Sequence, residues 1–359
     1  MRAALSQEPL FHNSFPLWVR VLARGADPPG EIMTMFVVYH PGYTVDIGPH
    51  YRFPMQKYRL VYERLLAEGT LAQVHILQPD LATIDDLLLV HTRAYVDRFL
   101  TGAMTPKEMR LLGFPWSDPL AQRARLATQG TLTASLMAWN HGLASNLAGG
   151  SHHAFADHGE GFSVFNDIAV AIRVLQRDHG LQRAAIIDCD VHQGNRTATI
   201  FAGDASVFTC SLHGEKNYPF RKARSSLDIE FPDGTEDAAY LAALQMHLPA
   251  VLERFQPQMV WYLAGVDPYV GDKLGRLALT LEGLRQRDAY VLSTCRRAGI
   301  PVVTTMGGGY APHIEDIVEA HCQTVRLACE MATRLEGIQE SCSLIKKKVG
   351  YTPKSYGGS

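Results

Sequence analysis

The chain has 359 residues, of which 47% are hydrophobic and 19% are charged. This balance is typical of a globular protein with a large core, and it excludes a disordered chain or a collagen-like repeat. With 34 Lys and Arg against 36 Asp and Glu, the net charge is −2, which gives the whole chain no electrostatic reason to bind nucleic acid directly.

Residues 1–32 carry several arginines and a Pro-Pro-Gly turn at 28–30, and we predict that they form an extension outside the core. No apolar run approaches the roughly 18 residues of a membrane span, and nothing near the N-terminus resembles a signal peptide. The six cysteines contain no Cys-x-x-Cys pair, as expected in a reducing compartment. These features predict a cytoplasmic protein that does not contact membranes.

From residue 33 onward, short apolar runs alternate with longer stretches of helical periodicity, which favours an α/β fold. The predicted strands are residues 35–39, 73–76, 184–188, 207–211, 259–264 and 301–305. The predicted helices are residues 54–68, 85–100, 122–140, 169–179, 237–255, 281–298 and 314–333. We therefore predict a single domain over 33–340, with an open, mostly parallel sheet flanked by helices on both faces, and a solvated tail at 341–359.

The predicted strand at 184–188 runs directly into three potential ligands, Asp188, Asp190 and His192. Side chains two residues apart share one face of an extended chain. Two ionised carboxylates near the buried end of a sheet repel each other unless a cation compensates them, which favours a metal site. Taken alone, an Asp-x-His pattern more often reflects a helix cap beside a surface histidine.

The predicted strand at 259–264 is also followed by an acid, Asp267. In open α/β sheets, ligands bind where the strands end. Asp190, His192 and Asp267 together would form a three-ligand set of nitrogen and oxygen donors with an open position, which is the pattern of a catalytic zinc site. No cysteine belongs to this set, which argues against a closed structural zinc site.

Two glycine-containing turns complete the candidate site. His152 and His153 follow the turn at 149–151, and a hydrolase that activates water needs an acid and a base with pKa values near neutrality. Three glycines at 307–309 permit close backbone approach and would present Tyr310 to the same cavity. Each motif alone is also typical of a surface loop or a tight turn.

Taken together, these motifs resemble the zinc-dependent histone deacetylase family, which includes deacetylase-like amidohydrolases and acetylpolyamine amidohydrolases with the arginase/deacetylase fold. The resemblance covers about residues 33–335. It looks closest to the class IV branch, through HYRFPMQKY at 50–58, DVHQGN at 190–195 and GTED at 234–237.

The resemblance implies that Asp190, His192 and Asp267 hold one zinc per chain, with iron(II) as a possible substitute. It also implies an inner site for a monovalent cation, usually potassium, formed by backbone carbonyls with the side chains of Asp188 and Ser211. Zinc would lower the pKa of water to about 7 and polarise the amide carbonyl.

The resemblance further assigns the acid and base chemistry. His152 is implied to be oriented by Asp188, and His153 to deprotonate the attacking water and later protonate the leaving amine. Most deacetylases place an Asp behind the second histidine, but here the position is Asn195, which cannot stabilise an imidazolium by charge, so we expect a weaker base. Tyr310 is implied to donate its hydroxyl to the substrate carbonyl.

A narrow tunnel for a lysine-like stem is also implied, and two departures from the family pattern bear on it. The expected substrate-binding residues are Gly161, Phe162, Tyr218, Leu274, Ser151, Gly308 and Gly309. The segment 101–112 offers only Glu108 where many members place an Asp that holds the substrate backbone, so peptide specificity stays open. Ser151 replaces a Trp found in several members, and we expect it to leave room for acyl groups longer than acetyl.

The function expected from the resemblance is zinc-dependent removal of acetyl or longer acyl groups from lysine-like amines. An acetylpolyamine or other small-molecule amidohydrolase stays open as an alternative, and a silent acyl-binding module is disfavoured because ligands, base and Tyr310 are all present. A two-manganese ureohydrolase on the same fold would need an acid two residues after His192, where Gly194 stands. Oligomeric state is not predicted.

Overall fold

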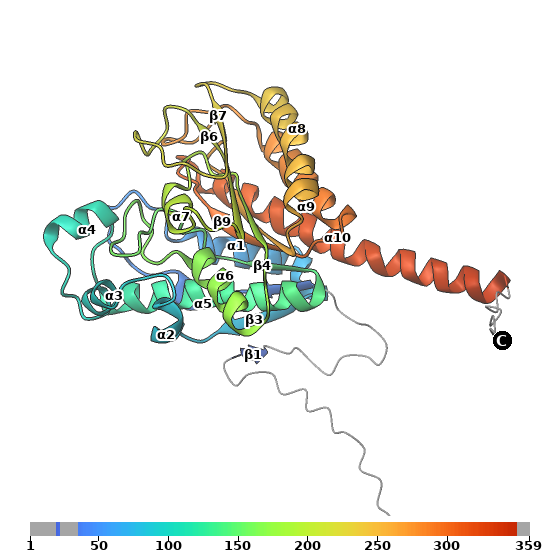
Figure 1. The fold of residues 1–359 in the computed structure, drawn as a ribbon, viewed down its shortest axis with the longest axis horizontal. Coiled ribbons are helices and arrows are strands. Elements are labelled where there is room, and N and C mark those ends of the chain that lie inside the picture. Colours follow the sequence, from blue (N-terminus) through green and yellow to red (C-terminus); the bar gives the residue numbers. More distant parts are fainter. Residues whose placement is uncertain (1–18, 22–34, 350–359) are drawn as a thin grey trace, which may run out of the picture.

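The apolar runs form a nine-stranded sheet with helices packed on both faces (Figure 1). The computed structural model describes residues 19–21 and 35–349. The strand order is β1-β3-β2-β4-β9-β8-β5-β6-β7, and every pair is parallel except β1 with β3. The strands are β1 (Val19–Val21), β2 (Met35–Val38), β3 (His75–Pro79), β4 (Leu143–Asn146), β5 (Ala184–Asp188), β6 (Val207–Gly214), β7 (Leu227–Phe231), β8 (Met259–Gly265) and β9 (Val302–Gly307).

The helices form two layers around this sheet. The helix α5 packs on β2, β4 and β9 together with α6, whereas α1, α10, α9 and α8 contact one another in succession. The helices are α1 (Lys57–Ala67), α2 (Ile84–Leu87), α3 (Arg93–Leu100), α4 (Pro106–Leu112), α5 (Asp118–His141), α6 (Asp167–Asp178), α7 (Asn195–Ile200), α8 (Asp237–Phe255), α9 (Leu281–Arg297) and α10 (Ile314–Val349). None of the described helices is long and apolar enough to cross a membrane.

Three central strands determine where the polar residues gather. Every residue of β5, β8 and β9 is buried, as expected for parallel strands covered on both faces. The register pairs Asp188 at the end of β5 with Leu263 of β8, and Gly265 of β8 with Gly307 of β9. The segments that follow these strands therefore emerge side by side at one edge of the sheet.

The predicted α/β fold is confirmed, and several element boundaries differ from the prediction. The predicted helix 85–100 is two helices, because Thr92 leaves the helical conformation and its hydroxyl accepts a hydrogen bond from Tyr95 N to begin α3. The strands β4 and β7 and the helices α4 and α7 were not predicted, since each is short. The five residues of β7, LDIEF, do alternate apolar and polar side chains, and this signal was missed.

The structure describes only part of the two predicted terminal segments. Residues 19–21 form β1, which pairs with β3 at the edge of the sheet. The rest of the predicted extension 1–32 lies outside the described residues. The helix α10 continues to Val349, into the predicted tail 341–359, and the last ten residues of that tail also lie outside the described part.

A fully buried arginine on α9 joins the ends of two central strands. Arg287 donates hydrogen bonds to the carbonyl oxygens of Gly265 (2.6 Å) and Cys189 (3.2 Å). Its charge is balanced by Asp288 at 2.8 Å, which also accepts hydrogen bonds from Tyr262 of β8 and from α10. Because Cys189 and Gly265 lie just after β5 and at the end of β8, this contact fixes the polar segments that follow both strands.

We expect Arg287→Met to lower the free energy of unfolding by about 3–5 kcal/mol, because it leaves the carboxylate of Asp288 buried without a cation. Urea denaturation of both proteins measures this loss. Arg285→Met on the same helix is the matched control, since Arg285 is exposed and pairs with the exposed Glu282. Equal stability of the two variants would show that the buried contact does not hold the strand ends.

Candidate active site

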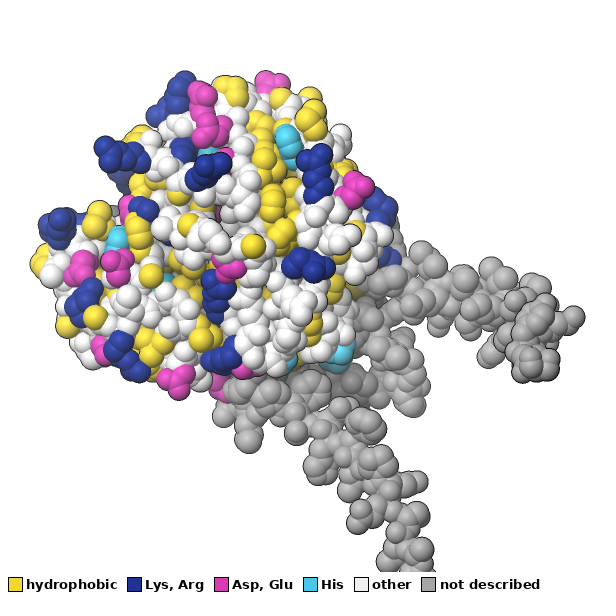
Figure 2. All heavy atoms as spheres, viewed as in Figure 1, with side chains coloured by type: hydrophobic (Ala, Val, Ile, Leu, Met, Phe, Trp, Pro, Cys, Tyr) yellow, Lys and Arg dark blue, Asp and Glu magenta, His cyan; other side chains and the backbone are white. Residues whose placement is uncertain are grey.

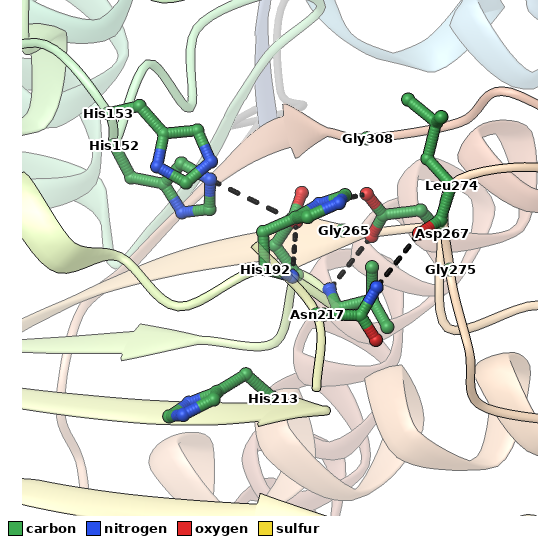
Figure 3. Close-up of polar contacts among 12 residues, drawn as sticks. His152, His153, His192, His213, Asn217, Gly265, Asp267, Leu274, Gly275 and Gly308 are labelled. Carbon is green, nitrogen blue, oxygen red and sulfur yellow. Dashed lines mark hydrogen bonds and ion pairs between the residues drawn. The ribbon is translucent and has the colours of Figure 1, made fainter. Parts of the chain in front are cut away.

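Three side chains from the ends of β5 and β8 converge at the edge of the sheet (Figure 3). His192 Nδ1 lies 2.9 Å from Asp190 Oδ1 and 3.1 Å from Asp267 Oδ2. One ligand atom from each of the three residues lies within 4.8 Å of the other two. The predicted ligand set is thus brought together by two neighbouring strands.

The pKa values of the three side chains indicate which kind of ion this cluster can bind. Burial, followed by the neighbouring charge of Asp190, raises the pKa of Asp267 to about 7. Burial alone would lower the pKa of His192, but hydrogen bonds to the two carboxylates outweigh it and raise this pKa to about 10. Two buried carboxylates thus draw positive charge to the space between them. This donor set of one imidazole and two carboxylates fits a divalent cation such as zinc.

Backbone contacts hold the two carboxylates in place. Asp267 Oδ1 accepts a hydrogen bond from Val191 N at 2.9 Å, and Asp190 Oδ1 accepts one from His192 N at 2.9 Å. Gly308 has a φ of +57°, and a Cβ at this position would lie 2.2 Å from the Asp267 carboxyl carbon. Only glycine therefore allows the turn after β9 to pass so close to Asp267.

The two adjacent histidines lie beside this cluster with different partners. His152 Nδ1 is 2.7 Å from Asp188 Oδ2, whereas His153 Nδ1 is 2.8 Å from Asn195 Oδ1. Burial alone would lower the pKa of His152, but Asp188 and Asp190 raise it to about 9. Burial and the neighbouring His152 hold the pKa of His153 well below its usual range. The partners of the two imidazoles thus favour the charged form of His152 and the neutral form of His153.

A buried carboxylate fixes the turn that carries the two histidines. Asp167, the first residue of α6, accepts hydrogen bonds from Gly150 N at 3.0 Å and from Ser151 N at 2.8 Å. It also accepts one from the hydroxyl of Thr131 on α5 at 2.5 Å. The two helices that cover one face of the sheet thus position the histidine turn.

Tyr310 follows β9 and faces the same space. Its backbone N donates to Asp272 Oδ2 at 2.6 Å, and its ring centroid lies 6.5 Å from that of His192. The turn before it is held by Lys57, whose Nζ lies 2.5 Å from Gly308 O. Burial lowers the pKa of Lys57 to about 8 and raises that of Tyr310, so the phenol stays protonated and able to donate.

A cavity of about 480 Å³ joins these groups. Most of the residues predicted to bind substrate line it: Ser151, Gly161, Phe162, Tyr218, Leu274 and Gly308. Gly309 is not among the lining residues, and a Cβ there would instead meet Ile317 and Val266. A Cβ on Gly161 would lie 2.8 Å from the His153 ring, so glycine lets this wall approach the histidine closely.

Much of the segment 101–112, which offered only Glu108 where many family members place an Asp, folds as the helix α4. Glu108 completes a capping box with Thr105, and its carboxylate lies 3.0 Å from Arg98 Nη2. The carboxylate of Glu108 is therefore occupied by its contacts with Thr105 and Arg98. The backbone N atoms of Gly161 and Phe162 donate to Leu111 O and Leu112 O, so α4 supports the cavity wall instead.

Sequence reasoning missed several residues that shape the site. Lys57 and Arg123 are distant in sequence from the ligand motifs and line the cavity, whereas Asp272 follows Asp267 by five residues and holds Tyr310 N. A signal for Lys57 was present, since it belongs to the run at 50–58, whereas nothing marks Arg123 within its helix. Asp188 and Ser211 stand opposite each other in the β5–β6 register, and the potassium site expected there stays a prediction.

Comparisons with known proteins agree with this geometry. The model of the histone deacetylase domain family matches residues 51–325. The chain is 47% identical over 292 residues to an uncharacterized protein of Picosynechococcus, covering 81% of this chain and 97% of that protein. It is 32% identical to histone deacetylase 2 of Arabidopsis thaliana, covering 76% of this chain and 74% of that protein.

A histone deacetylase-like amidohydrolase of Pseudomonas aeruginosa is also 32% identical, with 73% of each chain covered. Among solved structures, the HDA15 HD domain superposes with a TM-score of 0.71 at 23% identity, covering 83% of this chain and 90% of that domain. This structural likeness shows the fold, which is that of arginases and deacetylases. The class IV resemblance stays a prediction. The family match and the two curated deacetylase relatives show that the chain belongs to the histone deacetylase family.

Proposed function

We propose that this chain is a zinc-dependent amidohydrolase that removes acyl groups from lysine-like amines. One observation carries the proposal: Asp190, His192, His153 and Tyr310 line one cavity, and Asp267 completes the three-ligand set next to it. Each group has a separate task in amide hydrolysis, and a module that only binds acyl groups would not need all of them together.

The donor set Asp190, His192 and Asp267 would hold the zinc, with iron(II) as a substitute. When bound, zinc lowers the pKa of water to about 7 and polarises the carbonyl of the substrate amide. The backbone contacts described above hold both carboxylates before any metal arrives. Asp188 and Ser211 would hold a structural potassium below the site.

His153 acts as the base and then as the acid. Asn195 Oδ1 can only accept a hydrogen bond, so His153 carries its proton on Nδ1 and leaves Nε2 free to take a proton from the attacking water. The same nitrogen then returns the proton to the leaving amine. His152, held protonated by Asp188, contributes positive charge next to the reacting groups.

Tyr310 stabilises the developing oxyanion by donating its hydroxyl to the carbonyl oxygen. The contacts of Asp272 with Tyr310 N and of Lys57 with Gly308 O fix the turn, so the phenol does not need to be ordered during the reaction. Phe162 and Tyr218 would enclose the aliphatic stem of the substrate, and the open space near Ser151 would receive the acyl group.

We expect Tyr310→Phe to lower kcat on an acetyl-lysine peptide by about 10²–10³-fold, because it deletes one oxyanion donor and keeps the ring. KM should change much less. Steady-state kinetics with acetyl- and octanoyl-lysine substrates measure both constants. Tyr290→Phe is the control, since Tyr290 on α9 does not line the cavity and donates its hydroxyl to Gln245 O. A loss of less than threefold would exclude Tyr310 from the chemistry, and no turnover of either substrate by the wild type would contradict the proposed function.

We expect Asn195→Asp to move the acidic limb of the kcat/KM profile to higher pH by about one unit. A carboxylate next to His153 favours the imidazolium and raises its pKa, and a base must be deprotonated to act, so more alkaline solution is needed. Asn140→Asp adds the same charge at an exposed site on α5 and should leave the limb in place. An unmoved limb in Asn195→Asp would show that His153 is not the base.

A further inference from the structure

The entrance of the catalytic cavity is bordered by arginine and lysine side chains. Arg110 of α4, Lys216 after β6 and Arg276 after β8 line the cavity at its mouth. A second hollow of about 550 Å³ adjoins it, since Arg110 and Phe162 line both, and this hollow also contains Arg52. In Figure 2, dark blue basic side chains lie over α4 at the left and over the loops next to β6 and β7 at the upper left.

The carboxylates around this entrance already have partners. Glu160 accepts a hydrogen bond from the hydroxyl of Tyr218 and pairs with Arg196 at 3.2 Å. Asp233 lies 3.1 Å from Arg276, and Glu215 lies 3.4 Å from Lys216. Glu108 is used in its capping box and by Arg98. A cationic substrate would therefore have to displace an existing contact to find a carboxylate here.

Two arginines at the entrance differ, because no described carboxylate forms an ion pair with them. Among the side chains that the structure describes, no carboxylate lies within 4.0 Å of Arg52 or Arg110, and both arginines are exposed. The lining of the second hollow contains no Asp or Glu: it consists of His50, Tyr51, Arg52, Pro106, Met109, Arg110, Gly113, Phe114, Pro115 and Phe162. Positive charge at the entrance is thus concentrated on the side formed by α4 and the segment before α1.

The same border carries exposed apolar side chains. Phe220 is 87% exposed and Leu111 is 47% exposed, and both line the mouth of the cavity, while Tyr51 lies in the second hollow. Exposed large apolar side chains that gather at one place are typical of a surface that binds another chain. Their position around the mouth favours an extended partner over a small amine that enters the cavity completely.

We infer that the substrate is an acylated lysine in an acidic stretch of polypeptide, whose carboxylates pair with Arg52 and Arg110 while its backbone covers Phe220 and Leu111. This inference rests on the proposed function and adds the substrate class to it. It also disfavours acetylated polyamines, because their remaining ammonium groups would meet like charges at the entrance.

Three acetyl-lysine peptides of equal length, with Asp, Ser or Lys on both sides of the modified residue, test the inference. An exposed ion pair contributes about 1.4- to 5-fold in affinity, so two pairs should raise kcat/KM of the Asp peptide roughly fivefold over the Ser peptide. The Lys peptide and monoacetylated spermidine should be the poorest substrates. At 0.5 M salt the preference should shrink, because exposed charges are screened.

Charge-reversal variants test whether Arg52 and Arg110 cause this preference. Arg52→Glu combined with Arg110→Glu should reverse the order of the Asp and Lys peptides. Arg254→Glu is the control, since Arg254 is exposed on α8 near the opposite edge of the sheet, and it should preserve the wild-type order.

The outcomes separate the two proposals. Turnover of the Ser peptide without any preference between Asp and Lys neighbours would overturn the inference and leave the proposed function standing. A preference for spermidine, or a preference that the double reversal does not change, would also overturn it. Loss of turnover on all peptides by the wild type would instead contradict the proposed function itself.

Discussion

The whole site depends on the burial of carboxylates at the ends of adjacent parallel strands. Asp190 and Asp267 meet on one imidazole, and ionised carboxylates in a buried space repel each other and lose their hydration. The fold offsets this in two ways: backbone N–H groups donate to both side chains, and His192 is drawn toward its protonated form. A divalent cation between the three side chains would replace that proton, because an imidazole binds a metal in its neutral form, and its charge would offset the repulsion instead.

The two histidines have different roles because their hydrogen-bond partners differ in charge. A carboxylate behind His152 keeps that ring protonated, whereas an amide behind His153 leaves that ring neutral and ready to accept a proton. Neighbouring residues in the chain thus gain opposite roles from residues on β5 and α7. The turns that carry the catalytic groups are also held by different residues. Asp167 fixes the histidine turn, whereas Lys57 and Asp272 fix the turn before Tyr310.

The sequence was sufficient for the fold class and for the clustering of Asp190, His192 and Asp267, because both depend on local patterns. Continuous apolar runs mark β5, β8 and β9, and ligands directly after such runs must meet when the strands are neighbours. Arg287, Lys57 and Asp272 were not predictable, since each acts on a segment far away in the chain. Glu108 was no clear match to the family's mouth residue, and a local capping box with Thr105 determines where its carboxylate lies.

Anomalous X-ray scattering from crystals of the purified protein measures directly whether a metal lies between these side chains. We expect one strong peak above the zinc absorption edge and none below it, located between His192 Nδ1 and the carboxylates of Asp190 and Asp267. In protein prepared with iron(II), the peak should appear at the iron edge in the same place. A site without any metal peak, or an ion held only by other residues, would contradict the account.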